Sequence, residues 1–91
     1  MKQDKVPQSV SEYIVCREDC TLQFLEALAM NGLAVRAYIE ECSRKNFQRI
    51  VIELINGEKV YSKCYFREEI AISIRIINVY IGYARSKNLR E

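Results

Sequence analysis

The middle of the chain reads FQRIVIELI (47–55), NG (56–57) and EKVYSKCYF (58–66), and this segment indicates the class of fold. Two apolar, β-branched runs flank an Asn-Gly pair, which is a strong signal for a tight β-hairpin. Both turn residues tolerate a positive φ, so the pattern predicts a type I′ turn at 56–57. The centre of this chain is therefore expected to be two antiparallel strands.

The segment after the hairpin is rich in isoleucine and predicts a helix from about residue 66 to residue 87. Glu68 and Glu69 fall in its first turn, where the helix dipole favours acidic groups. The apolar residues cover most of the helix surface, which leaves only a narrow polar stripe. Because Ile70, Ile72, Ile74 and Ile76 also alternate, a strand remains an alternative here.

Two segments before the hairpin are open to more than one interpretation. Apolar residues recur at helical spacing over 10–31, after a capping-box pattern that starts at Ser9 and before a glycine C-cap at Gly32. A second interpretation makes 12–17 a strand and starts the helix near Asp19. Residues 33–43 fit either a strand or a helix, and a strand is favoured because two strands alone are marginally stable.

These elements predict one small α+β domain with the order α-β-β-β-α. Its three-stranded antiparallel sheet is expected to carry both helices on one face. The domain is expected to span 9–88, with a flexible N-terminal arm at 1–8 and a frayed C-terminus at 89–91. With 91 residues, the chain has room for only a small core.

Composition restricts the chemistry. The chain has no histidine, which removes Cys-His and Ser-His-Asp catalysis and histidine metal ligands. The four cysteines (Cys16, Cys20, Cys42, Cys64) lack the paired spacing of zinc sites, so they are interpreted as small buried residues. No metal, cofactor or catalytic activity is predicted.

No apolar leader and no membrane span are apparent in the sequence, so the expected location is the cytoplasm, with reduced cysteines. The net charge of +2 indicates neither a nucleic-acid partner nor a membrane partner. The remaining signals are local ones, on the last helix and in two basic clusters.

The favoured function is an interaction or regulatory module that forms a homodimer through the last helix or binds another protein. The apolar surface of that helix exceeds what one sheet and one other helix need to cover. Tyrosine is also enriched at interfaces. The residues expected at this interface are Ile70, Ile74, Ile77, Tyr80, Ile81 and Tyr83.

The alternative is a nucleic-acid-binding protein with a role related to transcription. It would use basic residues at 44–49 and 85–90, namely Arg44, Lys45, Arg49, Arg85 and Lys87. The α-β-β-β-α order resembles the double-stranded-RNA-binding domain in outline. That family reads RNA with a basic helix start and a loop containing histidine, whereas this last helix begins Arg67-Glu68-Glu69, so the resemblance implies no shared site.

Overall fold

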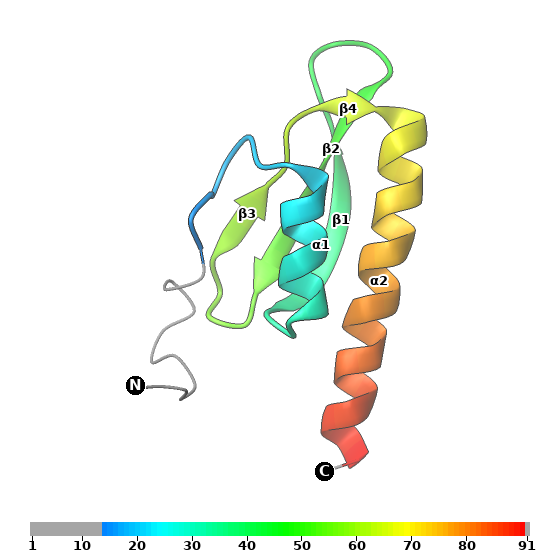
Figure 1. Ribbon diagram of the computed structural model, residues 1–91. Helices are drawn as coiled ribbons and strands as arrows, with labels where there is room; N and C mark the ends of the chain where they lie inside the picture. The colour runs from blue at the N-terminus through cyan, green and yellow to red at the C-terminus, as the bar shows by residue number, and fades with distance from the viewer. Residues whose placement is uncertain (1–13, 91) are drawn as a thin grey trace.

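The computed structural model describes residues 14–90, and the side chains of residues 14–86 (Figure 1). Its elements are α1 (Leu22–Met30), β1 (Ala34–Glu41), β2 (Phe47–Leu54), β3 (Lys59–Tyr61), β4 (Tyr65–Phe66) and α2 (Arg67–Arg90). Both helices lie on one face of an antiparallel sheet. The predicted α+β class is confirmed, with one short extra strand. The predicted arm at 1–8 and the Ser9 cap lie outside the described residues.

Helix α1 is shorter than the favoured prediction of 10–31. It begins at Leu22, and the Thr21 side chain accepts a hydrogen bond from the Phe24 backbone N–H (3.2 Å). The preceding residues are not helical: Cys20 forms an isolated parallel bridge with Ser62 instead. The alternative with a late helix start is therefore nearer to the structure, although Thr21 rather than Asp19 is the cap. Bonding of this segment to the sheet has overridden its helical periodicity.

The end of α1 agrees with the sequence. Gly32 has a φ of +76°. Its N–H donates to the Ala29 carbonyl (3.1 Å), and the Leu33 N–H donates to the Leu28 carbonyl (3.0 Å). This pattern is a Schellman motif, which favours glycine because of the positive φ. The chain then enters β1, so the ambiguous segment 33–43 contains a strand.

The hairpin is confirmed, but its turn is not type I′. Of the Asn-Gly pair, only Gly57 has a positive φ (+90°). Its N–H bonds the Leu54 carbonyl (2.9 Å), and the Leu54 N–H bonds the Glu58 carbonyl (2.8 Å). These bonds enclose a three-residue loop that ends in a left-handed glycine, a common hairpin form. The Asn56 side chain contributes by accepting from the Glu58 N–H (3.0 Å).

The predicted third strand is divided into β3 and β4, both of which pair with β2. Val51 pairs with Tyr61, whereas Gln48 pairs with Tyr65. Three steps along β2 therefore correspond to four steps along its partner, so one extra residue lies between β3 and β4. The extra residue interrupts the strand pairing next to Ile50. The hydroxyl of buried Ser62 accepts a hydrogen bond from the Ile50 N–H there (2.9 Å).

The core lies between the helices and the sheet, with β2 as the central strand. Ile50, Ile52 and Leu54 of β2 are almost completely buried. They meet Leu25 of α1 and Ile77 of α2 in one apolar cluster. Alternate residues of a strand point to one face, so this face of β2 is the one covered by helices.

Helix α2 confirms the predicted last element, with Glu68 and Glu69 in its first turn. It continues to Arg90, beyond the domain end expected at 88. Its C-terminal turns extend past the end of the sheet (Figure 1). In the part of the chain that the structure describes, no helix is long and apolar enough to cross a bilayer.

Candidate interaction surface

Most of the residues predicted to form an interface lie inside the molecule. Ile70 and Ile77 are fully buried, and Ile81 is 8% exposed. Ile74 and Tyr80 are partly buried and pack against the same core. Of the six residues predicted to form the interface, only Tyr83 is well exposed in the folded chain. The interface predicted from the sequence therefore has to be redrawn, because this face of α2 already packs on the sheet and α1.

A different set of apolar side chains on α2 reaches the surface. Ile72 is 63% exposed, Ile76 38%, Val79 68% and Tyr83 65%. Their spacing of four, three and four residues places them within about 60° of one another around the helix. We call these four residues the exposed stripe. The same spacing forms the apolar seam of coiled coils.

The signal for the exposed stripe was present in the sequence. Residues 72, 76, 79 and 83 widen the apolar face of the predicted helix beyond the residues that the structure buries. Periodicity alone did not tell which apolar face would meet the sheet. Spacing could not separate the two faces, because the inward-facing residues Ile70, Ile74, Ile77 and Ile81 follow the same steps of four, three and four residues.

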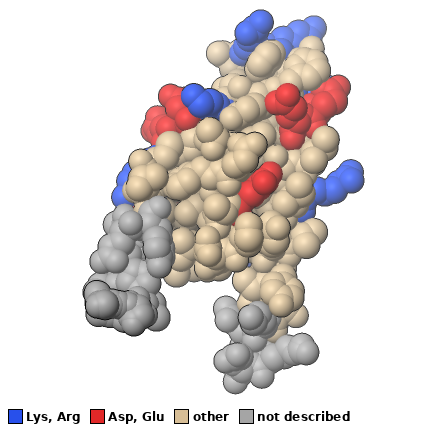
Figure 2. All heavy atoms as spheres, viewed as in Figure 1, with Lys and Arg blue, Asp and Glu red and all other residues tan. Residues whose placement is uncertain are grey.

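The exposed stripe has one charged neighbour near its middle, the exposed Arg75, three residues after Ile72 and four before Val79. Figure 2 views the side on which the helices lie and shows a broad area of uncharged side chains, with charged groups mostly at its margins. Between the helices, the buried hydroxyl of Ser73 donates to the Glu26 carboxylate (3.0 Å). This bond ties α2 to α1, so the exposed stripe is displayed on a supported helix.

The two basic clusters do not form one surface. The turn containing Arg44 and Lys45 adjoins the start of α2, where the Arg67 N–H bonds the Asn46 carbonyl (3.0 Å). Arg85 lies 18 residues further along the same helix, a distance of roughly 27 Å at 1.5 Å per residue. The side chain of Lys87 lies outside those described. Among the side chains of residues 14–86, the basic residues of the two clusters therefore do not meet in one surface.

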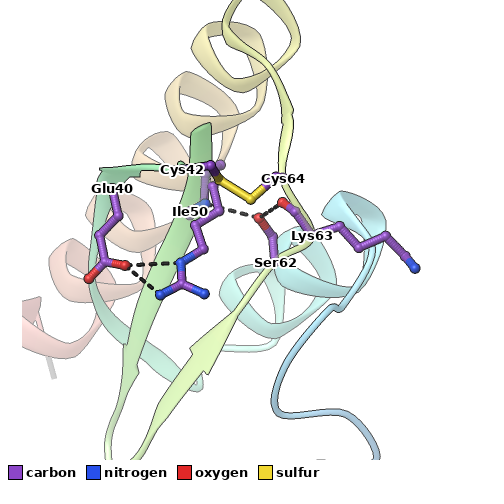
Figure 3. Close-up of polar contacts among 7 residues, drawn as sticks. Glu40, Cys42, Ile50, Ser62, Lys63 and Cys64 are labelled. Carbon is purple, nitrogen blue, oxygen red and sulfur yellow. Dashed lines mark hydrogen bonds and ion pairs between the residues drawn. A yellow bond between two sulfur atoms is a disulfide. The ribbon is translucent and has the colours of Figure 1, made fainter. Parts of the chain in front are cut away.

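Arg44 and Arg49 also have partners within the fold. The guanidinium of Arg44 lies 4.6 Å from the ring centroid of Phe47. Arg49 donates to Glu40 through two nitrogens (2.9 and 2.7 Å; Figure 3). Its guanidinium also lies 4.5 Å from the ring centroid of Tyr61. Arg49 therefore contributes to the sheet surface rather than offering an unpaired charge.

This ion pair belongs to the sheet face opposite the helices, which is polar but well ordered. Arg36 repeats the arrangement, with a 3.0 Å ion pair to Glu53 and a 4.8 Å approach to the ring of Tyr38. Val51 pairs with Tyr38 on one side and Tyr61 on the other, and it is fully buried although the helices cover the other face. At the margin, the hydrogen bond with Tyr38 raises the pKa of Lys59 above its ordinary value.

The cysteines differ from their expected reduced state. Cys16 is bonded to Cys20 and Cys42 to Cys64, so none of the four is a free thiol. The interpretation of these residues as separate buried side chains is therefore wrong, and only Cys20 is buried. Cys42 and Cys64 are brought together by tertiary structure, whereas Cys16 and Cys20 pair locally, in a segment that was expected to be helical. Within the described residues, no group of three or more metal-ligating side chains gathers.

The Cys42–Cys64 disulfide crosses the central strand (Figure 3). Cys42 follows β1 and Cys64 lies between β3 and β4, so the bond joins the two segments that flank β2. Strands two apart in a flat sheet are separated by about 9.5 Å. Here the two Cα atoms are 6.4 Å apart, and both cysteines lie just outside the paired strands.

The segment 61–63 also forms backbone hydrogen bonds with Cys20, which precedes α1. The Cys20 N–H bonds the Tyr61 carbonyl (3.1 Å), and the Lys63 N–H bonds the Cys20 carbonyl (2.8 Å). The Cys16–Cys20 loop is thereby attached to the edge of the sheet. An ion pair between Arg17 and Glu58 adds a second attachment.

A scan against protein-family models and searches of curated proteins and of solved structures found no match to this chain.

Proposed function

We propose that this protein is a small, non-catalytic interaction module that self-associates through the exposed stripe of α2. The observation that carries the proposal is the display of Ile72, Ile76, Val79 and Tyr83 along one line of a helix. Contiguous apolar surface of this kind is typical of contact sites between proteins. The regulatory role expected from the sequence belongs to the same proposal.

The form of the stripe favours a helix as its partner. Apolar residues at alternating four- and three-residue steps pack into the holes of a second helix with the same spacing. A second copy of the chain supplies such a helix, and most homo-oligomers are two-fold dimers in which the same patch meets itself. The protein partner considered from the sequence would have to offer an equivalent helix.

The experiment is a comparison of mass in solution by sedimentation and light scattering. We expect the wild type to be a dimer and Ile72→Asp to be a folded monomer, because the aspartate would be desolvated in the dimer alone. Ile55→Asp is the matched control, since Ile55 is 55% exposed in the hairpin loop. A wild type that stays monomeric at the highest attainable concentration would refute self-association.

The compartment is a separate part of the proposal. The cytoplasmic location stays a prediction, whereas paired cysteines in a small chain are typical of oxidising compartments. Trapping free thiols in intact cells, followed by mass measurement of the protein, distinguishes the two. Four alkylated cysteines would support the cytoplasm, and none would support an oxidising compartment.

A further inference from the structure

Under the proposed self-association, we infer that the partner of the exposed stripe is a second copy of α2 that lies antiparallel to it. The inference rests on three features of the helix: the symmetry of its apolar spacing, the difference in charge between its ends, and its extension past the sheet.

The spacing of the exposed stripe is the same in both directions. Reading from Ile72 to Tyr83 gives steps of four, three and four residues, and the reverse reading gives the same steps. A two-fold axis midway between Ile76 and Val79 therefore places Ile76 opposite Val79 of the other copy, and Ile72 opposite its Tyr83. Each layer then combines a larger and a smaller side chain, which suits interdigitated packing.

The two ends of the stripe carry opposite charge in the sequence. Glu68 and Glu69 precede its first residue, and both are exposed. The helix positions that continue the stripe beyond Tyr83 are occupied by Lys87 and Arg90. On a helix of 3.6 residues per turn, positions 69 and 87 lie along the same side of the stripe. Antiparallel helices bring equivalent sides together, so Glu69 of one copy meets position 87 of the other.

The opposite alignment lacks this complementarity. In a parallel pair, the acidic first turn of α2 would lie beside the acidic first turn of its partner, and the basic ends would also meet. Like charges at neighbouring helix positions are unfavourable, and parallel helix dipoles add to that cost. The exposed Arg75 opposes this preference, because the two-fold axis brings Arg75 of both copies to the same side of an antiparallel pair. The charges at the two helix ends outnumber it and therefore favour the antiparallel alignment, although apolar packing alone permits both.

The shape of the molecule suits the same alignment. The C-terminal turns of α2 extend past the sheet of their own chain (Figure 1). In an antiparallel pair they lie beside the first half of the partner's α2, which its own sheet and α1 support. Residues such as Tyr83, which gain little cover from their own domain, are thereby covered by the partner.

The test is charge reversal in the intact, disulfide-bonded protein, with the dimer dissociation constant measured by sedimentation at low salt. We expect Glu69→Lys and Lys87→Glu each to weaken the dimer about tenfold, because two symmetric attractions become repulsions. The double variant Glu69→Lys/Lys87→Glu restores both attractions and should return to within about threefold of the wild type. Arg85→Glu is the control for Lys87→Glu, since it makes the same charge change on a side of α2 away from the stripe.

The outcomes separate this inference from the proposed function. A dimeric wild type whose single reversals do not weaken it, with no recovery in the double variant, overturns the antiparallel alignment alone. A monomeric wild type overturns self-association and the alignment together. Loss of affinity in the single variants with recovery in the double variant supports both.

A second measurement does not depend on charge. A photo-crosslinking benzoylphenylalanine in place of Ser86, in dimers of isotopically heavy and light chains, reports which segment of the partner is near. Crosslinks to residues 67–72 of the other copy are expected for the antiparallel pair. Crosslinks confined to 83–90 of the other copy would mean a parallel pair and overturn the inference.

Discussion

The two apolar faces of helix α2 have nearly the same composition and opposite surroundings. Ile70, Ile77 and Ile81 are enclosed by the sheet and α1, whereas Ile72 and Val79 are mostly exposed to solvent. The difference lies in angular position around the helix and not in residue type. Burial is therefore a property of the whole fold, and an isoleucine-rich helix can serve a core and an external contact together.

The buried face should give the largest effect when it is broken. Ile77→Asp places a carboxylate in a fully buried position and is expected to cost more than about 4 kcal/mol, enough to unfold the domain. Thermal unfolding followed by circular dichroism measures this. Ile77→Val, which should cost only about 1 kcal/mol, is the control for position. An aspartate variant that melts like the wild type would show that this face is not the core.

The disulfides should affect the stability of the fold and not the association of two chains. Replacing Cys42 and Cys64 by serine removes a closure of 22 residues and should cost about 3 kcal/mol. The Cys16 and Cys20 pair closes only four residues and should cost about 2 kcal/mol. Denaturant unfolding measures both differences. Dissociation of the dimer in folded double-serine variants would contradict the separation of the two properties.

Ser73 lies at the boundary between the two faces. Ser73→Ala removes the hydrogen bond to Glu26 between the helices and is expected to cost about 1 kcal/mol. Ser86→Ala, at an exposed position of the same helix, should change the stability little. Equal melting temperatures for the two variants would mean that the hydroxyl–carboxylate bond makes no net contribution.

The exposed stripe should give the smallest effect on the stability of one chain. Val79→Ala is expected to change the folding free energy by less than about 0.5 kcal/mol. The same change should weaken the dimer about tenfold, because apolar groups are lost in both copies. Val35→Ala is a matched control on β1, where Val35 is 43% exposed. Equal dissociation constants for the two variants would argue against the stripe as the contact.

Much of the fold could be predicted from local signals. The hairpin at Asn56-Gly57, the glycine C-cap at Gly32 and the acidic start of α2 depend on residues close in sequence, and all are found. The start of α1 was placed too early because the bonds that hold Cys20 to Tyr61 and Lys63 join distant segments. The turn type was missed because Asn56 does not adopt the positive φ that it tolerates.

The candidate site was predicted in part for the same reason. An apolar excess on α2 could be read from its pattern, but the choice between Ile77 and Ile72 as the exposed side depends on where the sheet lies. The Cys42–Cys64 disulfide could not be predicted because the two residues meet across β2, an approach that no sequence spacing encodes. The Cys16–Cys20 disulfide is local, and the prediction of a helix with reduced cysteines hid it. Residues that act through long-range approach were the ones that local reasoning could not place.

The crossing of β2 by the Cys42–Cys64 bond has a consequence for local opening of the sheet. The two cysteines belong to segments on opposite sides of one strand, so the bond joins the two neighbours of β2 to each other. Where the hydrogen bonds at this end of β2 break, the covalent link still keeps both neighbours close to the strand, so the bond opposes separation of the sheet there.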